Sequence, residues 1–145
     1  RFFEPLAKRA GAAKSPAEAA KVVEGIAGLL VLAGAQATDE TMRAGVREAQ
    51  RGVFYILQAF YIHHEMWKEA IGAGERIRRI TKSGSAMYKD AVARARGGRK
   101  PESVLKSLES ALEAGFDDGK RFDGEKAFDA LRNDDAFKIL RSRCR

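Results

Sequence analysis

The hydrophobic residues repeat in steps of three and four over most of the chain, which is the period of an amphipathic α-helix. This pattern predicts helices over residues 2–13, 15–34, 38–84, 85–98 and 101–116. Nowhere do apolar and polar residues alternate in the way that marks a half-buried strand. We therefore expect an all-α protein of six to eight helices. Short links between helices make neighbours antiparallel, so an antiparallel helical bundle is expected.

The helix expected over 15–34 has a clear start signal. Ser15 is a capping residue, Pro16 suits the first helical position, and Gly34 suits the end. Beyond Ile26 the segment is apolar on all sides. A helix that is hydrophobic all round is normally buried, so we expect both faces of this one to be covered.

The proline-free stretch 38–84 is the longest helical pattern, with Thr38 as its expected cap. Its apolar positions form a seam over about four heptads, which we expect to be buried. Between Val53 and Ile62, the side chains of Phe54, Leu57 and Tyr61 leave the seam and widen the apolar surface, so we expect this piece to be the centre of the fold. The seam contains Met42, Val46, Ala49, Val53, Ile56, Phe60, His63, Trp67 and Ala70. The stretch is either one long helix or two helices broken near Gly52 or near Gly72 and Gly74.

Two shorter helices follow, over 85–98 and 101–116. Ser85 is the expected cap of the first. Gly115 stands where a left-handed helix stop requires glycine, and Phe116 can fold back on the last turn. The second helix should therefore end at this Gly-Phe pair.

The C-terminal part carries a family-like pattern. In "AMYKDAVARARGGRKPESVLKSLESALEAGF" (86–116), small and apolar packing positions lie on two helices joined by a Gly-Gly turn: Tyr88, Ala91 and Ala95, then Leu108 and Ala111. The later "LRNDDAFKIL" (131–140) has the form Leu-Arg-x-Asp-x-x-Phe-x-x-Leu. Together, residues 85–141 resemble the last repeat and capping tail of a tetratricopeptide-type repeat protein.

This resemblance covers less than half of the chain. Asp90 stands where a small apolar residue is usual, and Val104 replaces the usual alanine. Residues 1–84 show no clear repeat of about 34 residues. We therefore interpret residues 1–145 as one all-α domain, with a divergent helical part before a repeat-like hairpin and capping tail over 85–145.

The resemblance implies a role for the tail. Two short apolar clusters, Phe128/Leu131 and Phe137/Leu140, each follow an acidic start signal. The terminal repeat of a stacked array has no next neighbour to cover its face. We expect short capping helices that carry these clusters to cover that face.

Composition narrows the setting of the protein. The 145 residues carry a net charge of +7 and one cysteine, Cys144. A single cysteine allows no internal disulfide, so we expect an intracellular protein, in the cytoplasm or an organelle interior. The apolar segments 26–35 and 53–62 are far shorter than the roughly 20 residues that span a bilayer. The first residue is Arg1, which leaves room for a targeting peptide removed before it.

The sequence offers little chemistry for a catalytic, cofactor or metal site, and we expect none of the three. His63 and His64 are adjacent, and adjacent helical positions point about 100° apart, which suits one metal poorly. "GAGERI" (72–77) lacks the third glycine of a dinucleotide loop. Cys144 has no obvious histidine partner. A helical-bundle enzyme is the alternative that this missing chemistry disfavours.

Basic clusters are the remaining candidates for binding, in "RIRRITK" (76–82), "RARGGRK" (94–100) and "RSRCR" (141–145). They suit a solvated surface, an acidic protein surface or the phosphates of RNA. No aromatic residues interleave with them, so base stacking is unsupported.

The resemblance favours the protein partner. It implies a non-catalytic scaffold or accessory subunit in which the first helix of each unit, here 85–96, lines the binding surface. We predict that an acidic protein surface binds a basic strip along this helix and the segment before it: Arg76, Arg78, Arg79, Lys89, Arg94 and Arg96. The alternative is an RNA-contacting subunit of a ribonucleoprotein, whose affinity would fall steeply with salt.

Overall fold

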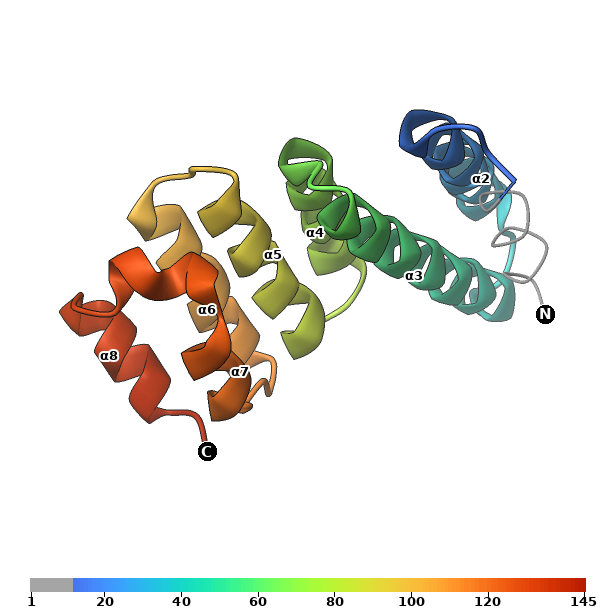
Figure 1. The fold of residues 1–145 in the computed structure, drawn as a ribbon. Helices are drawn as coiled ribbons and strands as arrows, with labels where there is room; N and C mark the ends of the chain where they lie inside the picture. The colour runs from blue at the N-terminus through green and yellow to red at the C-terminus, as the bar shows by residue number, and fades with distance from the viewer. Residues whose placement is uncertain (1–11) are drawn as a thin grey trace.

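The computed structural model describes residues 12–145, and this part of the chain contains helices and no strand (Figure 1). In chain order the helices are α2 (Pro16–Gln36), α3 (Glu40–His63), α4 (Trp67–Ile80), α5 (Gly84–Arg96), α6 (Pro101–Glu113), α7 (Gly119–Gly124), the 3-10 helix η1 (Lys126–Leu131) and α8 (Asp135–Ser142). The predicted all-α fold with short C-terminal helices is confirmed. The helix predicted over 2–13 lies almost entirely outside the described residues.

Helices α2 to α6 stand in a row, and each packs against the next one along the chain (Figure 1). The tail then folds back on the end of this row, where η1 packs on α5 and α8 packs on α6. One cluster of buried apolar side chains runs from α2 to α8. The arrangement leaves each inner helix covered by a neighbour on both sides.

A side chain that accepts a backbone hydrogen bond caps the start of α2, α3 and α5, and the sequence predicted the capping residue correctly only for α2. Ser15 caps α2 as predicted, and its Oγ accepts the N–H three residues on at 3.2 Å. Asp39 caps α3 in place of Thr38, with its Oδ1 2.8 Å from the corresponding N–H. Ser83 caps α5 in place of Ser85. At the start of α3, Thr38 and Asp39 are both residues that can cap a helix. The carboxylate of Asp39 also interacts favourably with the positive end of the helix dipole, which favours it as the cap.

The long pattern over 38–84 is two helices, and both predicted positions of the break are wrong. Gly52 lies inside α3, and Gly72 and Gly74 lie inside α4. The chain turns instead at residues 64–66. None of these glycines interrupts a helix, so glycine alone did not locate the boundary.

The break between α3 and α4 is a left-handed turn built without glycine. Glu65 has a φ of 57°, and the N–H of Met66 donates to the carbonyl of Tyr61 at 2.8 Å. This hydrogen bond satisfies one of the last carbonyls of α3 in the manner of a Schellman turn. A left-handed conformation costs a non-glycine residue about 1–2 kcal/mol, so the packing of α4 against α3 must offset that cost.

The buried stripe of α3 is rotated relative to the predicted seam. Val53 is fully buried, but Ile56 is 41% exposed and Met42 is 51% exposed. Phe60 and Trp67, predicted to be buried, are half-buried at the edge of the core. The observed stripe consists of Val53, Phe54, Leu57, Gln58 and Tyr61, so the predicted apolar contribution of Phe54, Leu57 and Tyr61 is confirmed. A coiled-coil seam serves one neighbour, whereas α3 packs on both α2 and α4 and therefore needs a differently placed, wider stripe.

The second half of α2 is exposed on one side, so the prediction that both faces are buried is wrong. Leu29, Val31 and Leu32 are 64%, 55% and 61% exposed. The covered face of α2 carries Ala19, Ala20, Val23 and Ala27. This helix packs mainly on α3, so a helix that is apolar all round still has only one covered face here.

Gly115 ends α6 as predicted. Its φ is +97°, and the N–H of Phe116 donates to the carbonyl of Ala111 at 3.0 Å. The turn brings Phe116 onto Tyr88 of α5, where the two rings stack with centroids 4.3 Å apart and planes 11° apart. The helix stop therefore also places the first aromatic side chain of the tail.

An aromatic cluster closes this end of the row. Phe128 and Phe137 are buried together with Leu131 and Leu140, as predicted from the two apolar clusters. Phe122 of α7 was not singled out in the sequence, yet it is fully buried. Its ring centroid lies 5.8 Å from that of Phe128 and 5.1 Å from that of Phe137. The short helices of the tail are therefore held by shared burial rather than by their own length.

Removing the central ring of this cluster tests how much the tail stabilises the fold. We expect Phe122→Ala to lower the free energy of unfolding by about 3–5 kcal/mol, the usual cost of deleting a buried phenylalanine. Lys120→Ala in the same helix is the control, and this exposed position should change stability by less than about 0.5 kcal/mol. Urea unfolding followed by circular dichroism measures both. Equal effects would show that the tail does not belong to the core.

Candidate binding surfaces

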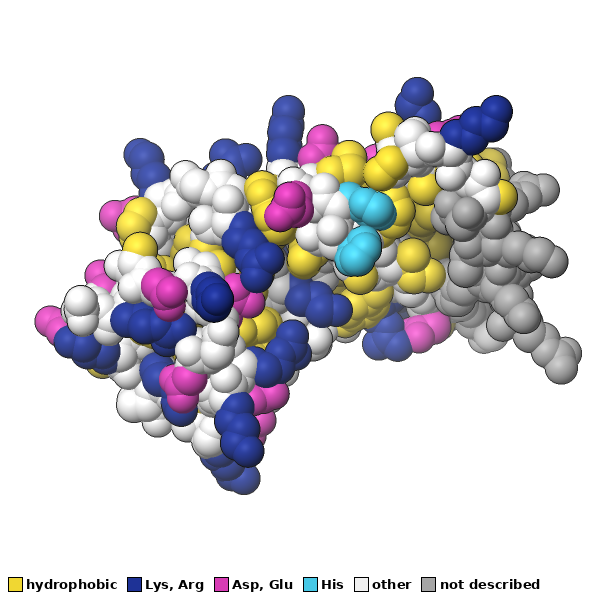
Figure 2. Space-filling view, in the orientation of Figure 1, with side chains coloured by type: hydrophobic (Ala, Val, Ile, Leu, Met, Phe, Trp, Pro, Cys, Tyr) yellow, Lys and Arg dark blue, Asp and Glu magenta, His cyan; other side chains and the backbone are white. Residues whose placement is uncertain are grey.

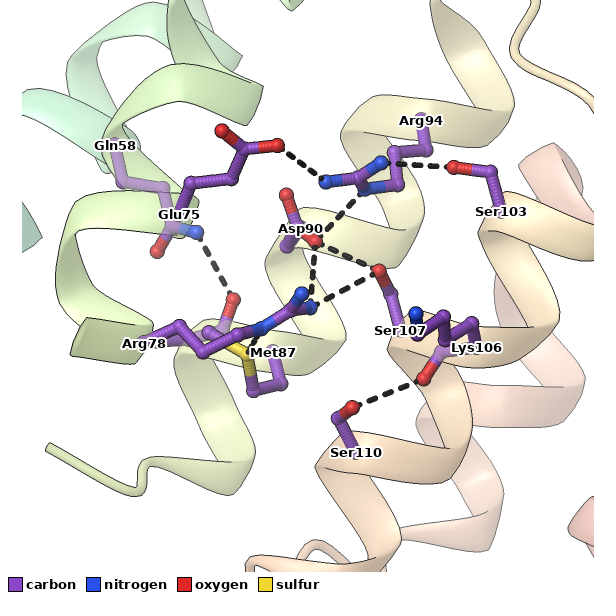
Figure 3. A network of polar contacts seen from close by, with 11 residues as sticks. Gln58, Glu75, Arg78, Met87, Asp90, Arg94, Ser103, Lys106, Ser107 and Ser110 are labelled. Atoms are coloured by element: carbon purple, nitrogen blue, oxygen red, sulfur yellow. Dashed lines mark hydrogen bonds and ion pairs between the residues drawn. The ribbon is translucent and has the colours of Figure 1, made fainter.

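A buried carboxylate lies between α4, α5 and α6. Asp90 has no exposed surface, and a single oxygen, Oδ2, accepts from three side chains (Figure 3). The distances are 2.9 Å to Nε of Arg94, 3.4 Å to Nη2 of Arg78 and 2.7 Å to Oγ of Ser107. Asp90 is one of the positions at which the sequence departs from the tetratricopeptide pattern that it resembles. The aspartate replaces an apolar contact with a polar link between three helices.

The two arginines around Asp90 make further contacts within the protein (Figure 3). Arg94 donates to Oγ of Ser103 at 2.8 Å and pairs with Glu75 at 3.2 Å, and its side chain is only 14% exposed. Arg78 is 38% exposed and lies 3.4 Å from Oγ of Ser107. Charge-assisted hydrogen bonds of this kind are stronger than neutral ones. Both guanidinium groups are therefore occupied in holding the fold.

Gly74 allows α4 to approach the buried carboxylate. A methyl group at this position would lie 2.8 Å from Oδ1 of Asp90 and 3.1 Å from its Cβ. Oδ1 itself has no hydrogen-bond partner within the described residues. The glycine therefore serves close packing here, since its φ is not in the left-handed region.

The structure divides the six predicted binding residues into three pairs. Arg78 and Arg94 converge on Asp90. The other four line two separate grooves, with Arg76 and Arg79 beside α2, and Lys89 and Arg96 beside α3 and the tail. The six side chains do not share one surface, because α4 carries its two outward arginines on the side of α2, whereas α5 carries its two cations on the side of α3.

The larger groove lies between α2 and α4, over α3, and has a volume of about 640 Å³. Its floor is apolar and consists of Ala27, Gly28, Val31, Leu32, Phe54 and Ile80. Arg76 and Arg79 stand at its edge, and neither forms an ion pair within residues 12–145. The guanidinium carbon of Arg76 lies 5.4 Å from the ring centre of Phe54, at a distance typical of a cation–π contact.

The same groove contains a carboxylate that already accepts a hydrogen bond from a neighbouring side chain. Glu24 lines the same groove, and its carboxylate accepts a hydrogen bond from the hydroxyl of Tyr61. Burial and this hydrogen bond to Glu24 raise the pKa of Tyr61, which keeps the phenol protonated. The groove therefore combines an apolar floor with two cations, the amide of Gln50 and one hydrogen-bonded carboxylate.

The smaller groove lies between α3, α5 and the tail and has a volume of about 300 Å³. Its lining is Ala59, Ile62, His63, Tyr88, Lys89, Val92, Arg96, Arg121 and Glu125. Figure 2 looks onto this side of the molecule and shows Lys and Arg side chains between the two histidines and the C-terminal tail. Arg121 was missed in the sequence because it stands in an acidic stretch of the tail, outside the basic clusters.

Tyr88 lines this smaller groove and contacts Arg121. Its hydroxyl donates to the backbone carbonyl of Arg121 at 2.9 Å, and the guanidinium carbon of Arg121 lies 4.9 Å from the centre of its ring. Burial raises the pKa of Tyr88 to about 12, with the nearby carboxylate of Glu125 adding to the shift. The phenol is therefore a neutral hydrogen-bond donor near neutral pH.

Groups that suggest chemistry elsewhere are sparse in the part of the chain that the structure describes. No cluster of three or more His, Cys, Asp or Glu side chains able to hold a metal occurs there. His63 and His64 are exposed, with ring centroids 5.0 Å apart. Burial raises the pKa of the Cys144 thiol, which lowers its thiolate fraction. Among these residues no helix is both long and apolar enough to cross a bilayer.

Comparison with known proteins finds no matching protein family, no matching curated protein and no matching solved structure. The resemblance of residues 85–141 to a tetratricopeptide repeat therefore stays a prediction from those residues.

A pair of glycines in one helix tests the packing around Asp90. We expect Gly74→Ala to lower the free energy of unfolding by about 1–3 kcal/mol, because the new methyl overlaps the carboxylate. Gly72→Ala is the matched control, since a methyl there meets nothing within 4 Å. It should raise stability by up to about 1 kcal/mol through helix propensity. Chemical denaturation compares the two, and a stabilising Gly74→Ala would show that the carboxylate is not tightly enclosed.

Proposed function

We propose that this chain is a non-catalytic scaffold or accessory subunit whose α2–α4 groove holds an acidic, amphipathic helical segment of a partner protein. The observation that carries the proposal is an apolar floor bordered by two arginines that form no ion pair within the described residues. We propose an intracellular location, the cytoplasm or an organelle interior, in keeping with the single cysteine, Cys144.

The apolar side of the groove supports a helical partner. Val31 and Leu32 are more than half exposed although they stand beside the core. Exposed apolar side chains that adjoin one another, with polar residues at the rim, are typical of interaction sites. An amphipathic helix laid between α2 and α4 would bury them through apolar residues spaced three and four apart.

The charges of the groove support an acidic partner. Arg76 is held over the ring of Phe54, and Arg79 stands one turn further along α4. The carboxylate of Glu24 is hydrogen-bonded to Tyr61, so it does not neutralise either arginine by direct contact. Carboxylates on the polar side of the partner helix would meet these two cations, which favours association and the correct orientation.

An RNA-contacting subunit is the alternative that the net charge of +7 favours. RNA binding draws on phosphate contacts along a basic surface and on stacking of bases against exposed rings. Among residues 12–145, the aromatic ring that lines this groove belongs to Phe54, which is only 4% exposed. The apolar floor therefore suits a protein helix better than unpaired bases.

Site-specific photo-crosslinking in an extract of the native source tests the identity of the occupant. A photoreactive residue at position 32, inside the groove, should crosslink to one protein, whereas the same residue at exposed position 106 on α6 should not. Mass spectrometry of the linked peptide should show acidic residues and apolar residues at helical spacing. Crosslinks to RNA, to a basic segment or to a second copy of this chain would contradict the proposal.

Charge reversal tests the role of the two groove arginines. We expect the double variant Arg76→Glu and Arg79→Glu to weaken the complex with the crosslinked partner by about tenfold or more, because like charges would then face each other. Lys106→Glu with Lys126→Glu changes the net charge equally at exposed sites elsewhere and should leave the affinity unchanged. Both variants should keep the circular dichroism spectrum of the parent. Full affinity in the groove variant would place the interface elsewhere.

A further inference from the structure

The smaller groove holds more positive charge than its surroundings neutralise. Lys89, Arg96 and Arg121 line it against a single carboxylate, Glu125. Oε1 of Glu125 already accepts from Arg96 at 2.9 Å and from the backbone N–H of Ala127 at 3.0 Å. Lys89 and Arg121 form no ion pair within the described residues. Three cations facing one carboxylate leave a surplus that matches a doubly charged anion.

We infer that the groove between α3, α5 and the tail is a second binding site, which takes the phosphate group of a phosphorylated side chain in a partner protein. Such a group carries a charge of about −2 near neutral pH and three strong acceptor oxygens. The side chains of Lys89, Arg96 and Arg121 line the groove and supply donors for those oxygens. The residues that line this groove are distinct from those of the α2–α4 groove, so either site can exist without the other.

Two of the cations are held in place before any ligand arrives. The guanidinium carbon of Arg121 lies 4.9 Å from the ring centre of Tyr88 and 5.9 Å from that of Phe116. Arg96 is held by Glu125 and lies 5.8 Å from the ring centre of Trp67. A guanidinium packed over a ring keeps the N–H groups at its edge available for paired hydrogen bonds to phosphate. Preorganised donors lose little conformational freedom on binding, which favours affinity.

The same contacts argue against nucleic acid as the source of the phosphate. Bases bound by a protein surface commonly stack on free aromatic faces. Tyr88 is only 3% exposed, with Phe116 stacked on it and Arg121 above its ring. The groove is also small, about 300 Å³, and Glu125 would repel a backbone of successive phosphates. One phosphate group on a protein side chain fits this short, mixed lining better.

A titration followed by nuclear magnetic resonance tests the inference with the full chain. The probes are two otherwise identical short Gly/Ala peptides with one central threonine, phosphorylated in one peptide and unmodified in the other. We expect the phosphopeptide to bind at least about tenfold more tightly, since hydrogen bonds to charged groups contribute that much or more. Its saturable shifts should centre on His63, Lys89, Arg96 and Arg121.

Matched variants make the result specific to the groove. Arg121→Gln should weaken phosphopeptide binding by about tenfold or more, whereas Arg99→Gln in the exposed α5–α6 loop should not. Should Arg121→Gln disturb the folded spectrum, Lys89→Gln provides the same comparison. Equal affinity for both peptides, or an equal loss of affinity in Arg99→Gln, would overturn the inference. It would also be overturned if oligouridine displaced the bound phosphopeptide at a lower concentration than unlabelled phosphopeptide does.

Discussion

The middle of this fold depends on the hydrogen bonds and ion pairs that the buried carboxylate of Asp90 accepts. A charge removed from water costs several kcal/mol unless ion pairs and hydrogen bonds compensate it. Here Arg94, Arg78 and Ser107 all reach one oxygen, so three helices are held around a single atom. The same contact explains why α4 carries Gly74 opposite the carboxylate. It also takes two arginines out of the set that is free to meet a partner.

The two ends of the row of helices differ in how far other side chains cover them. At the C-terminal end, the ring of Phe122 and its aromatic neighbours cover α5 and α6. Towards the N-terminal end, α2 packs mainly on α3, and Leu32 stays exposed beside a groove edged by Arg76 and Arg79. The closed end completes the core, and we propose that the open groove supplies the surface for a partner.

Hydrophobic period and local signals predicted most of the helices, because both depend on residues near in sequence. Ser15 and the stop at Gly115 are examples. The turn at 64–66 was not predicted because it contains no glycine or proline. The network around Asp90 was not predicted, since partners such as Arg78 and Ser107 are far apart in the chain and their contact depends on packing. The i,i+4 spacing of Asp90 and Arg94 was the one local signal that pointed to this network.

We expect Asp90 and its two arginines to act as one coupled network rather than as separate surface charges. A double-mutant cycle with Asp90→Ala and Arg94→Ala measures this coupling, through the free energy of unfolding of the parent, both single variants and the double variant. We expect the double variant to lose less stability than the two single variants combined, with a coupling energy of about 1–3 kcal/mol, as found for contacting residues in one network. Effects that add within about 0.5 kcal/mol would contradict the claim, because independent sites behave in that way.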